Sequence, residues 1–198
     1  VARALEVLNT SAQRARRMVN DILDFTRAGL GGGIPMQLAD IDLAEVVSQL
    51  VAETRTVQPG RHIALEVDGS ARGHFDGDRV AQALSNLLGN ALAYSPPDET
   101  VTLRVTDHHH EVRVEVKNRG PTIPPEVLPM LFKPFQRGPA TGGHGGGGRS
   151  VGLGLFIVEQ IAHGHRGRIE VESQDGTTCF RLVLPRRSPS GRMRALTV

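Results

Sequence analysis

The sequence predicts an α+β two-layer sandwich, in which three helices lie on one face of a mixed, largely antiparallel sheet of roughly five strands. Segments with helical periodicity alternate with segments in which every second residue is apolar. The alternating segments come in pairs joined by short turns, which is typical of antiparallel hairpins. The chain has 198 residues, 39% of them hydrophobic and 22% charged, which suits one domain plus an appendage.

A long helix is expected over residues 1–28. Its apolar positions step by four and three residues in a heptad pattern: Val1, Leu5, Leu8, Ala12, Ala15, Val19 and Ile22. Such a helix can pack on its own domain, but the regular pattern before a linker favours a two-helix or dimeric bundle. Gly29 and the glycines at 31–33 end this helix. The expected domains are therefore 1–30, 31–185 and a disordered basic tail at 186–198.

The main domain reads as an alternation of strands and helices. Asp42, followed by Glu45 in a capping-box-like spacing, is expected to start a helix that runs to about Val57. The other elements are expected as strands at 36–41, 62–67, 73–76, 101–105, 112–116, 169–171 and 180–184, and as helices at 78–93, near 125–131 and at 151–162.

Charge and composition exclude several classes of function. Lys plus Arg is 23 and Asp plus Glu is 21, and the net charge of +2 is too small for a general nucleic-acid binder. The two lysines, Lys117 and Lys133, do not follow glycine, which excludes the phosphate loop of nucleotide hydrolases. A single cysteine, Cys179, is expected to be a buried, inert thiol. Neither a signal peptide at 1–8 nor a membrane span is expected, and the start at Val1 is interpreted as that of a fragment of a longer protein.

The first candidate site segment is the helix at 78–93 and the residues that follow it. Asn86, Asn90 and Tyr94 are four residues apart, so they share one helical face. A carboxamide oxygen is a competent ligand for Mg²⁺. The alternative is a pair of exposed asparagines, and this segment alone does not decide between the two.

Two further segments follow in the chain. After the strand at 112–116, Asn118 can present its amide to a base edge, and Gly120 lets a ligand approach the backbone near Ile123. An ordinary turn is the simpler interpretation of that segment alone. Next, Phe135 is expected to anchor the following loop, and Arg137 can reach a phosphate.

A glycine-rich loop and a helix start complete the set. The loop at 138–150 has seven glycines and is expected not to hold one shape without a ligand. Backbone N–H groups at a helix start attract anions, and this helix opens with Gly152, Leu153, Gly154 and Leu155. The pattern lacks the third glycine and the preceding strand of a dinucleotide-binding fingerprint.

In this order the segments resemble the ATP-binding catalytic domain of bacterial sensor histidine kinases, of the GHKL superfamily with its Bergerat-type fold. The resemblance covers about residues 36–185, and Gly176-Thr177-Thr178 also fits it. Residues 1–28 resemble the second helix of the family's dimerisation and phosphotransfer hairpin. The resemblance implies ATP and Mg²⁺ as cofactors, a response regulator receiver domain as partner, and a homodimer through the N-terminal helix of the parent.

The resemblance also implies residue roles. Asn90 would ligate Mg²⁺, Tyr94 would pack on adenine, and Thr177 or Thr178 would lie beside the base. Gly152 and Gly154 would anchor the lid over the phosphates. Asn86 sits where hydrolysing relatives carry a glutamate base, and because a carboxamide cannot take a proton from water, ATP would be kept for transfer to a histidine.

Four departures from the family pattern affect these expectations. Asn118 replaces an aspartate, which predicts weaker discrimination between ATP and GTP, since an amide can also donate. Thr122 replaces a glycine, and Ala93 replaces a basic residue for which Arg137 or Arg149 would have to substitute. The segment at 163–167 reads as if two residues were inserted into a His-Gly-Gly motif.

The family's phosphoacceptor motif is absent. Its nearest match, at 110–113, lies in an alternating strand and lacks the following proline, so it is interpreted as a false match. The leading hypothesis is the catalytic part of a cytoplasmic protein-histidine kinase, unable to phosphorylate itself, whose parent is soluble or membrane-associated. The alternatives are a non-catalytic, pseudokinase-like nucleotide-binding and dimerisation module and, disfavoured by Asn86, an ATPase of the gyrase type.

Overall fold

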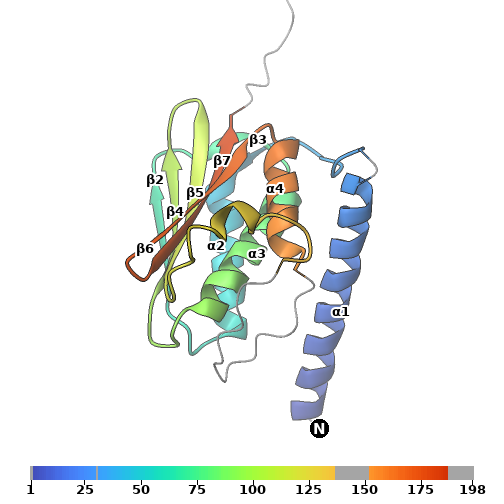
Figure 1. Cartoon of the computed structure of the whole chain (residues 1–198), viewed down its shortest axis with the longest axis vertical. Helices are drawn as coiled ribbons and strands as arrows, with labels where there is room; N and C mark the ends of the chain where they lie inside the picture. Colours follow the sequence, from blue (N-terminus) through green and yellow to red (C-terminus); the bar gives the residue numbers. More distant parts are fainter. Residues whose placement is uncertain (1, 30, 137–151, 187–198) are drawn as a thin grey trace, which may run out of the picture.

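The computed structural model describes residues 2–29, 31–136 and 152–186. Figure 1 shows a sheet covered on one side by helices, with a long N-terminal helix alongside. In chain order the elements are α1 (Ala2–Gly29), β1 (Ala39–Asp42), α2 (Leu43–Val57), β2 (Ile63–Asp68), β3 (Arg72–Phe75), α3 (Gly77–Tyr94), β4 (Val101–Asp107), β5 (Glu111–Arg119), η1 (Leu128–Met130), α4 (Gly154–Gly164), β6 (Arg168–Gln174) and β7 (Thr177–Pro185).

The main sheet has five strands in the order β2-β4-β5-β7-β6, and β1 pairs with β3 in a separate two-stranded sheet. The β2–β4 pair is parallel, whereas β4–β5, β5–β7 and β6–β7 are antiparallel. Helices α2, α3 and α4 cover one face of the main sheet. The two-layer sandwich that the sequence predicts is therefore confirmed.

The hydrophobic core lies between these two layers. In β5 the buried side chains of Val112, Val114 and Val116 alternate with more exposed residues, so one strand face points at the helices. The buried face of α3 comprises Val80, Ala83, Leu84, Leu87, Leu88, Ala91 and Leu92. The opposite face of α3 is thereby left for polar residues.

Side-chain caps start two of the helices. The Asp42 carboxylate accepts a hydrogen bond from Ala44 N at 3.0 Å, as expected from the sequence. At the start of α3, Asp76 accepts from Arg79 N with one oxygen and from Gln37 N with the other. Asp76 thus fixes both the helix start and the chain that leads into the domain.

Helix α1 packs beside α4 through an aromatic contact. The Phe25 ring lies 5.6 Å from that of Phe156 at an interplanar angle of 66°. On α1, the heptad residues Val19 and Ile22 are exposed, so this part of the heptad face is not buried against the described residues. Pairing through that face stays a prediction. No helix among the described residues is long and apolar enough to cross a membrane.

The C-terminal end of α4 lies two residues beyond the expected end at 162. The helix continues to Gly164, and Gly167 N then donates to Ala162 O while Arg166 N donates to His163 O. This is a Schellman-type helix end, and Arg166 takes its left-handed position with φ of 57°. His165, Arg166 and Gly167 therefore form the helix cap, and His163 and Gly164 belong to the helix.

Other elements differ in detail. The first strand spans 39–42 rather than 36–41, and α4 starts at Gly154 rather than at Val151, which lies outside the described residues. Cys179 is half-buried rather than fully buried, and its burial raises the pKa of the thiol. The expected disordered tail falls outside the described residues from 187 onward.

Candidate functional site

The polar face of α3 carries the first group of candidate residues. Asn86 and Asn90 are half-buried and Tyr94 is exposed, on the side of the helix that faces away from the core. The Asn86 side-chain nitrogen donates to the carbonyl oxygen of Gly154 at 3.2 Å. A Cβ on Gly154 would lie 3.4 Å from Asn86 Cγ, so α4 begins in close contact with this face. The structure thus brings together the asparagine segment and the glycine-started helix.

The end of β5 forms the second group. Asn118 is 5% exposed and stands opposite Thr178 of β7 in the strand register. Two residues on, a side chain at Gly120 would collide with the carbonyl oxygen of Tyr94. Only glycine allows this close approach, so the strand end lies directly against the C-terminal end of α3.

Three hydrogen bonds fix the segment after β5 against the β6–β7 hairpin. Gly120 N donates to Gly176 O at 2.9 Å, and Gly176 N donates to Thr122 Oγ1 at 2.9 Å. Ile123 N donates to Ser173 Oγ at 2.9 Å. Thr122 is not among the described residues with positive φ, so threonine fits here without backbone strain and holds the hairpin turn.

A backbone contact joins the two ends of the glycine-rich loop. Phe135 N donates to Gly152 O at 2.9 Å, with φ of 62° at Phe135 and 77° at Gly152. A Cβ on Gly152 would meet Gln136 O at 2.8 Å. The next residue, Leu153, is fully buried and Leu155 packs against the core. Chain positions 135 and 152 are therefore fixed relative to the core.

The end of α1 lies against Phe135, at one end of the glycine-rich loop. The Phe25 ring is 5.1 Å from the Phe135 ring at 72°, an edge-to-face contact. On the same helix Asp24 is 3% exposed, and its Oδ2 accepts from Arg79 Nη1 at 2.7 Å and from Gln82 Nε2 at 2.9 Å. Helix α1 thus contacts both Phe135 and α3.

A cleft of about 600 Å³ lies between α1 and α3. It is lined by Arg16, Asn20, Asp21, Leu23, Asp24, Arg27, Asp78, Arg79, Gln82, Ser85 and Asn86. Because Asn86 lies at the cleft and also contacts α4, the cleft adjoins the candidate nucleotide site.

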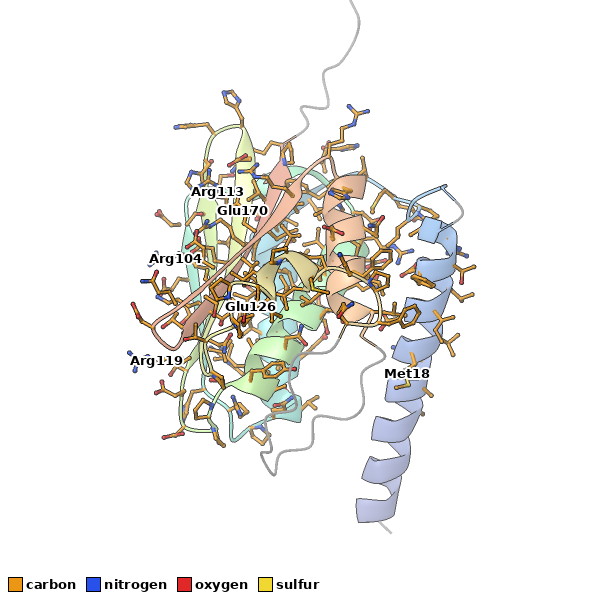
Figure 2. The ribbon with its side chains drawn as sticks, in the orientation of Figure 1. Met18, Arg104, Arg113, Arg119, Glu126 and Glu170 are labelled. Carbon is orange, nitrogen blue, oxygen red and sulfur yellow. The ribbon has the colours of Figure 1, made fainter. Side chains whose placement is uncertain are left out.

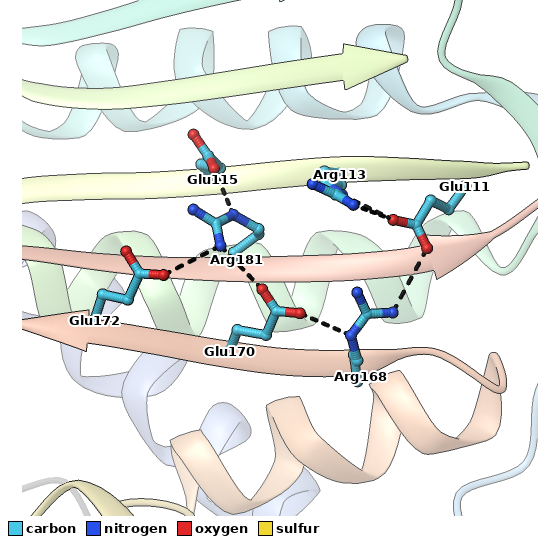
Figure 3. Close-up of polar contacts among 7 residues, drawn as sticks. All are labelled: Glu111, Arg113, Glu115, Arg168, Glu170, Glu172 and Arg181. Carbon is cyan, nitrogen blue, oxygen red and sulfur yellow. Dashed lines mark hydrogen bonds and ion pairs between the residues drawn. The ribbon is translucent and has the colours of Figure 1, made fainter. Parts of the chain in front are cut away.

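The face of the sheet away from the helices carries charged residues. Arg104, Arg113 and Glu170 lie on that side (Figure 2). Figure 3 shows the ion pairs that connect β5, β7 and β6, which join Glu111, Arg113, Glu115, Arg168, Glu170, Glu172 and Arg181. Arg181 is central, with 2.6 Å to Glu115 and 2.9 Å to Glu170. The hydrogen bond from Arg181 lowers the pKa of Glu170 below its ordinary value.

Not every expected site residue can be placed. Arg137 and Arg149 lie outside the described residues. Thr177 begins β7 opposite Arg119, half-buried, so Thr178 is the more deeply buried of the two threonines. The sequence interpretation missed Ser173, Asp24 and Arg79. Asp24 and Arg79 are 55 residues apart, and Ser173 and Ile123 are 50 apart, so no local pattern marks these contacts.

The described residues suit a magnesium site to which the protein supplies only one or two ligands. No group of three or more His, Cys, Asp or Glu that could hold a metal occurs in the described part of the chain. Mg²⁺ in nucleotide sites usually keeps several waters and takes one or two protein oxygens plus phosphate. The half-buried Asn90, on the same face as Asn86, has a side chain suited to supply one such oxygen.

The chain is similar to known proteins in both sequence and structure. A family model described as "Histidine kinase-, DNA gyrase B-, and HSP90-like ATPase" matches residues 75–188. A bacteriophytochrome of Pseudomonas aeruginosa is 36% identical over 180 residues, which cover 91% of this chain and 24% of that protein. Sensor histidine kinase TrcS of Mycobacterium tuberculosis is 35% identical over 188 residues, which cover 92% of this chain and 36% of that protein. The chain therefore spans well under half of either relative.

Two solved structures are also similar. Full-length ShkA in complex with AMPPNP has a TM-score of 0.70 at 25% identity, covering 95% of this chain and 40% of that chain. Histidine kinase ThkA in complex with response regulator protein TrrA has a TM-score of 0.69 at 23% identity, covering 93% of this chain and 51% of that chain. At that identity the second comparison supports the fold alone.

Proposed function

Because this chain belongs to the family of histidine kinase-, DNA gyrase B- and HSP90-like ATPases, and matches the catalytic domains of sensor histidine kinases, we propose that it binds ATP with Mg²⁺ for phosphoryl transfer. The acceptor would be a histidine outside this chain. One observation carries the proposal: Asn86 contacts Gly154, so the asparagine face of α3 lies beside the glycines that begin α4. The relative ShkA was solved with AMPPNP, which agrees with a nucleotide at such a site.

The residues of this chain would divide the work as follows. Asn90 would supply an amide oxygen to Mg²⁺, which neutralises phosphate charge when bound. The exposed ring of Tyr94 would stack on the base, and Asn118 with Thr178 would contact the base edge. Gly152 and Gly154 would let phosphates approach the start of α4.

Asn86 favours transfer over hydrolysis. A carboxamide has no basic site that can take a proton from water. The Asn86 nitrogen is also already engaged with Gly154 O, so the side chain has a positioning role between α3 and α4. Catalysis would then consist mainly of placing the γ-phosphate in line with the acceptor and neutralising its charge.

The partners are also part of the proposal. The exposed Val19 and Ile22 on α1 provide an apolar face for a second copy of the helix in the parent protein. A response regulator receiver domain would accept the phosphoryl group from the histidine. Both assignments rest on membership of the sensor kinase family, since the chain covers only part of its relatives.

A non-catalytic regulatory module is the second candidate. Ala93 is exposed and supplies no cation for a phosphate, unlike the basic residue usual in the resembling family. Asn118 and Thr122 likewise depart from the catalytic pattern. Such a module would bind nucleotide without transferring phosphate.

Calorimetric titration with ATP and with AMPPNP, with and without Mg²⁺, tests the proposal. We expect saturable, Mg²⁺-dependent binding that Asn90→Ala weakens at least about tenfold, the loss of one good metal contact. Gln49→Ala, an exposed carboxamide on α2, serves as the matched control. Absence of binding by a folded protein would contradict the proposal.

A second assay separates the two candidates. Radiolabelled ATP is added together with a phosphoacceptor hairpin of a related kinase, supplied as a separate chain. Labelled histidine supports the kinase. Nucleotide binding without label on any of several hairpins supports the regulatory module.

A further inference from the structure

Ser173 on β6 lies at the centre of a short hydrogen-bond chain beside Thr178. Its Oγ accepts from Ile123 N at 2.9 Å and lies 2.9 Å from Thr178 Oγ1. Thr178 is 5% exposed and stands opposite Asn118 in the register of β5 and β7. Ser173 therefore contacts Thr178, the residue that would lie beside the base.

The contacts of Ser173 favour one direction for the hydroxyl protons. Ser173 already accepts the Ile123 N–H, and donating its own proton to Thr178 Oγ1 uses both of its observed partners. In the reverse direction, Ser173 would accept twice and its proton would have no observed acceptor. With Ser173 as donor, the Thr178 hydroxyl oxygen accepts from Ser173, and the Thr178 hydroxyl proton points away from Ser173. Thr178 then acts as a donor toward its other neighbours.

The side-chain amide of Asn118 is also oriented. Its nitrogen donates to the backbone oxygen of Arg119 at 3.2 Å. A flipped amide would place Asn118 Oδ1 against that oxygen, two acceptors in contact at a residue that is 5% exposed. Asn118 therefore presents its oxygen, an acceptor, as an aspartate would.

Asn118, with its acceptor oxygen, and Thr178, with its donor hydroxyl, are opposite residues on the neighbouring strands β5 and β7. The Watson–Crick edge of adenine offers an amino donor at N6 and an acceptor at N1. Guanine reverses both, with an acceptor at O6 and a donor at N1. We propose that Ser173 is a positioning residue which, together with the Arg119 carbonyl, makes Asn118 and Thr178 select adenine over guanine nucleotides. The inference rests on the proposed nucleotide site, and it replaces the expectation that Asn118 weakens discrimination.

Calorimetric affinities for ATP, GTP and inosine triphosphate test this inference. In the wild-type chain we expect ATP to bind at least about 100-fold more tightly than GTP, because two buried polar groups would be left mismatched. Inosine triphosphate shares O6 and N1–H with guanine but lacks its 2-amino group. It should therefore be rejected like GTP.

Variants of Ser173 separate positioning from general structure. Ser173→Ala should reduce the ATP-to-GTP ratio about tenfold, because the Thr178 hydroxyl can then reorient. Ser173→Thr keeps the hydroxyl and should restore the ratio. Thr178→Val removes the oriented donor and should behave like Ser173→Ala.

Each outcome distinguishes the inference from the proposed function. If neither ATP nor GTP binds, the nucleotide site itself fails. If both bind equally to the wild-type chain, nucleotide binding stands and the inference is overturned. If Ser173→Ala weakens ATP and GTP by the same factor, Ser173 is only structural and the inference is likewise overturned.

Discussion

The side-chain nitrogen of Asn86 donates to the carbonyl oxygen of Gly154 at 3.2 Å, a contact between residues 68 positions apart. Gly154 is the first residue of α4, and its carbonyl accepts from α3. Asn86 therefore fixes the spacing of the two helices that would flank the phosphates. A carboxamide at position 86 cannot act as a base toward water, which agrees with holding ATP. Its N–H group also supplies the hydrogen bond to Gly154, which a carboxylate could not donate.

Asn86→Ala should loosen the start of α4. The Gly154 carbonyl loses a donor, which costs about 1 kcal/mol of stability. Hydrogen exchange of the first turn of α4 should become faster, whereas that of the sheet should not change. Ser85→Ala, the neighbouring half-buried position, is the control. Unchanged exchange in α4 would show that the contact does not hold the helix.

Asp24→Asn should release α1 from α3. Asp24 is buried and accepts from both Arg79 and Gln82. Removing one charge of a buried pair costs about 3–5 kcal/mol when the other charge stays buried, and undocking of α1 avoids that cost. We expect faster hydrogen exchange throughout α1 and an unchanged melting temperature for residues 31–186. Asp78→Asn, exposed at the same cleft, should leave α1 protected.

Arg166→Gly should stabilise the domain by about 1 kcal/mol, because a side chain in the left-handed region costs roughly that much. Urea unfolding measures the change. Arg166→Ala keeps the strained backbone and should give no comparable gain. Equal stabilisation by both variants would assign the effect to the arginine side chain instead.

Glu170 should make stability depend on pH in the acid range. The Arg181 hydrogen bond lowers the pKa of Glu170 below its ordinary value of 4.5. The unfolded chain therefore binds the proton more readily, and the contribution is present above about pH 4.5 and lost as pH falls through the folded pKa. Glu170→Gln should lose less stability than wild type between pH 6 and pH 3, roughly the range over which such a carboxylate titrates. Glu172→Gln, more exposed and 3.5 Å from Arg181, should behave like wild type.

Thr122→Val should weaken the β6–β7 turn. The Thr122 hydroxyl accepts from Gly176 N, and valine has a similar shape without the oxygen. The amide of Gly176 should exchange roughly tenfold faster, equivalent to one lost hydrogen bond. Thr122→Ser should retain protection. Equal exchange in Thr122→Val and wild type would show that the hydroxyl contributes nothing to the turn.

Most of the fold could be predicted from local patterns. The alternation in β5 and the apolar face of α3 each reflect a single buried side, which periodicity reports directly. The cap at Asp42 was also predictable from local sequence, because the backbone N–H that it accepts from is two residues away. Asn86, Asn118 and Gly154 were identified by motif order, and the structure brings Asn86 to Gly154.

The remainder depends on contacts between distant segments. Nothing near Asp24 in the chain indicates that Arg79 will neutralise it. The end of α4 lies two residues beyond the expected 162, because Gly164 is helical and the cap is made by Arg166 in the left-handed region, where glycine is the usual residue. Ser173 was missed because its partners, Ile123 and Thr178, meet only once the strands pair.

The backbone contact between Phe135 and Gly152 also has a consequence for engineering. This hydrogen bond holds Phe135 and Gly152 together, so the spacing of these two positions does not depend on the length of the segment between them. Doubling a loop costs only about 0.6 kcal/mol of closure entropy. A folded domain with adjacent termini can therefore be inserted between these two positions without redesign of the scaffold.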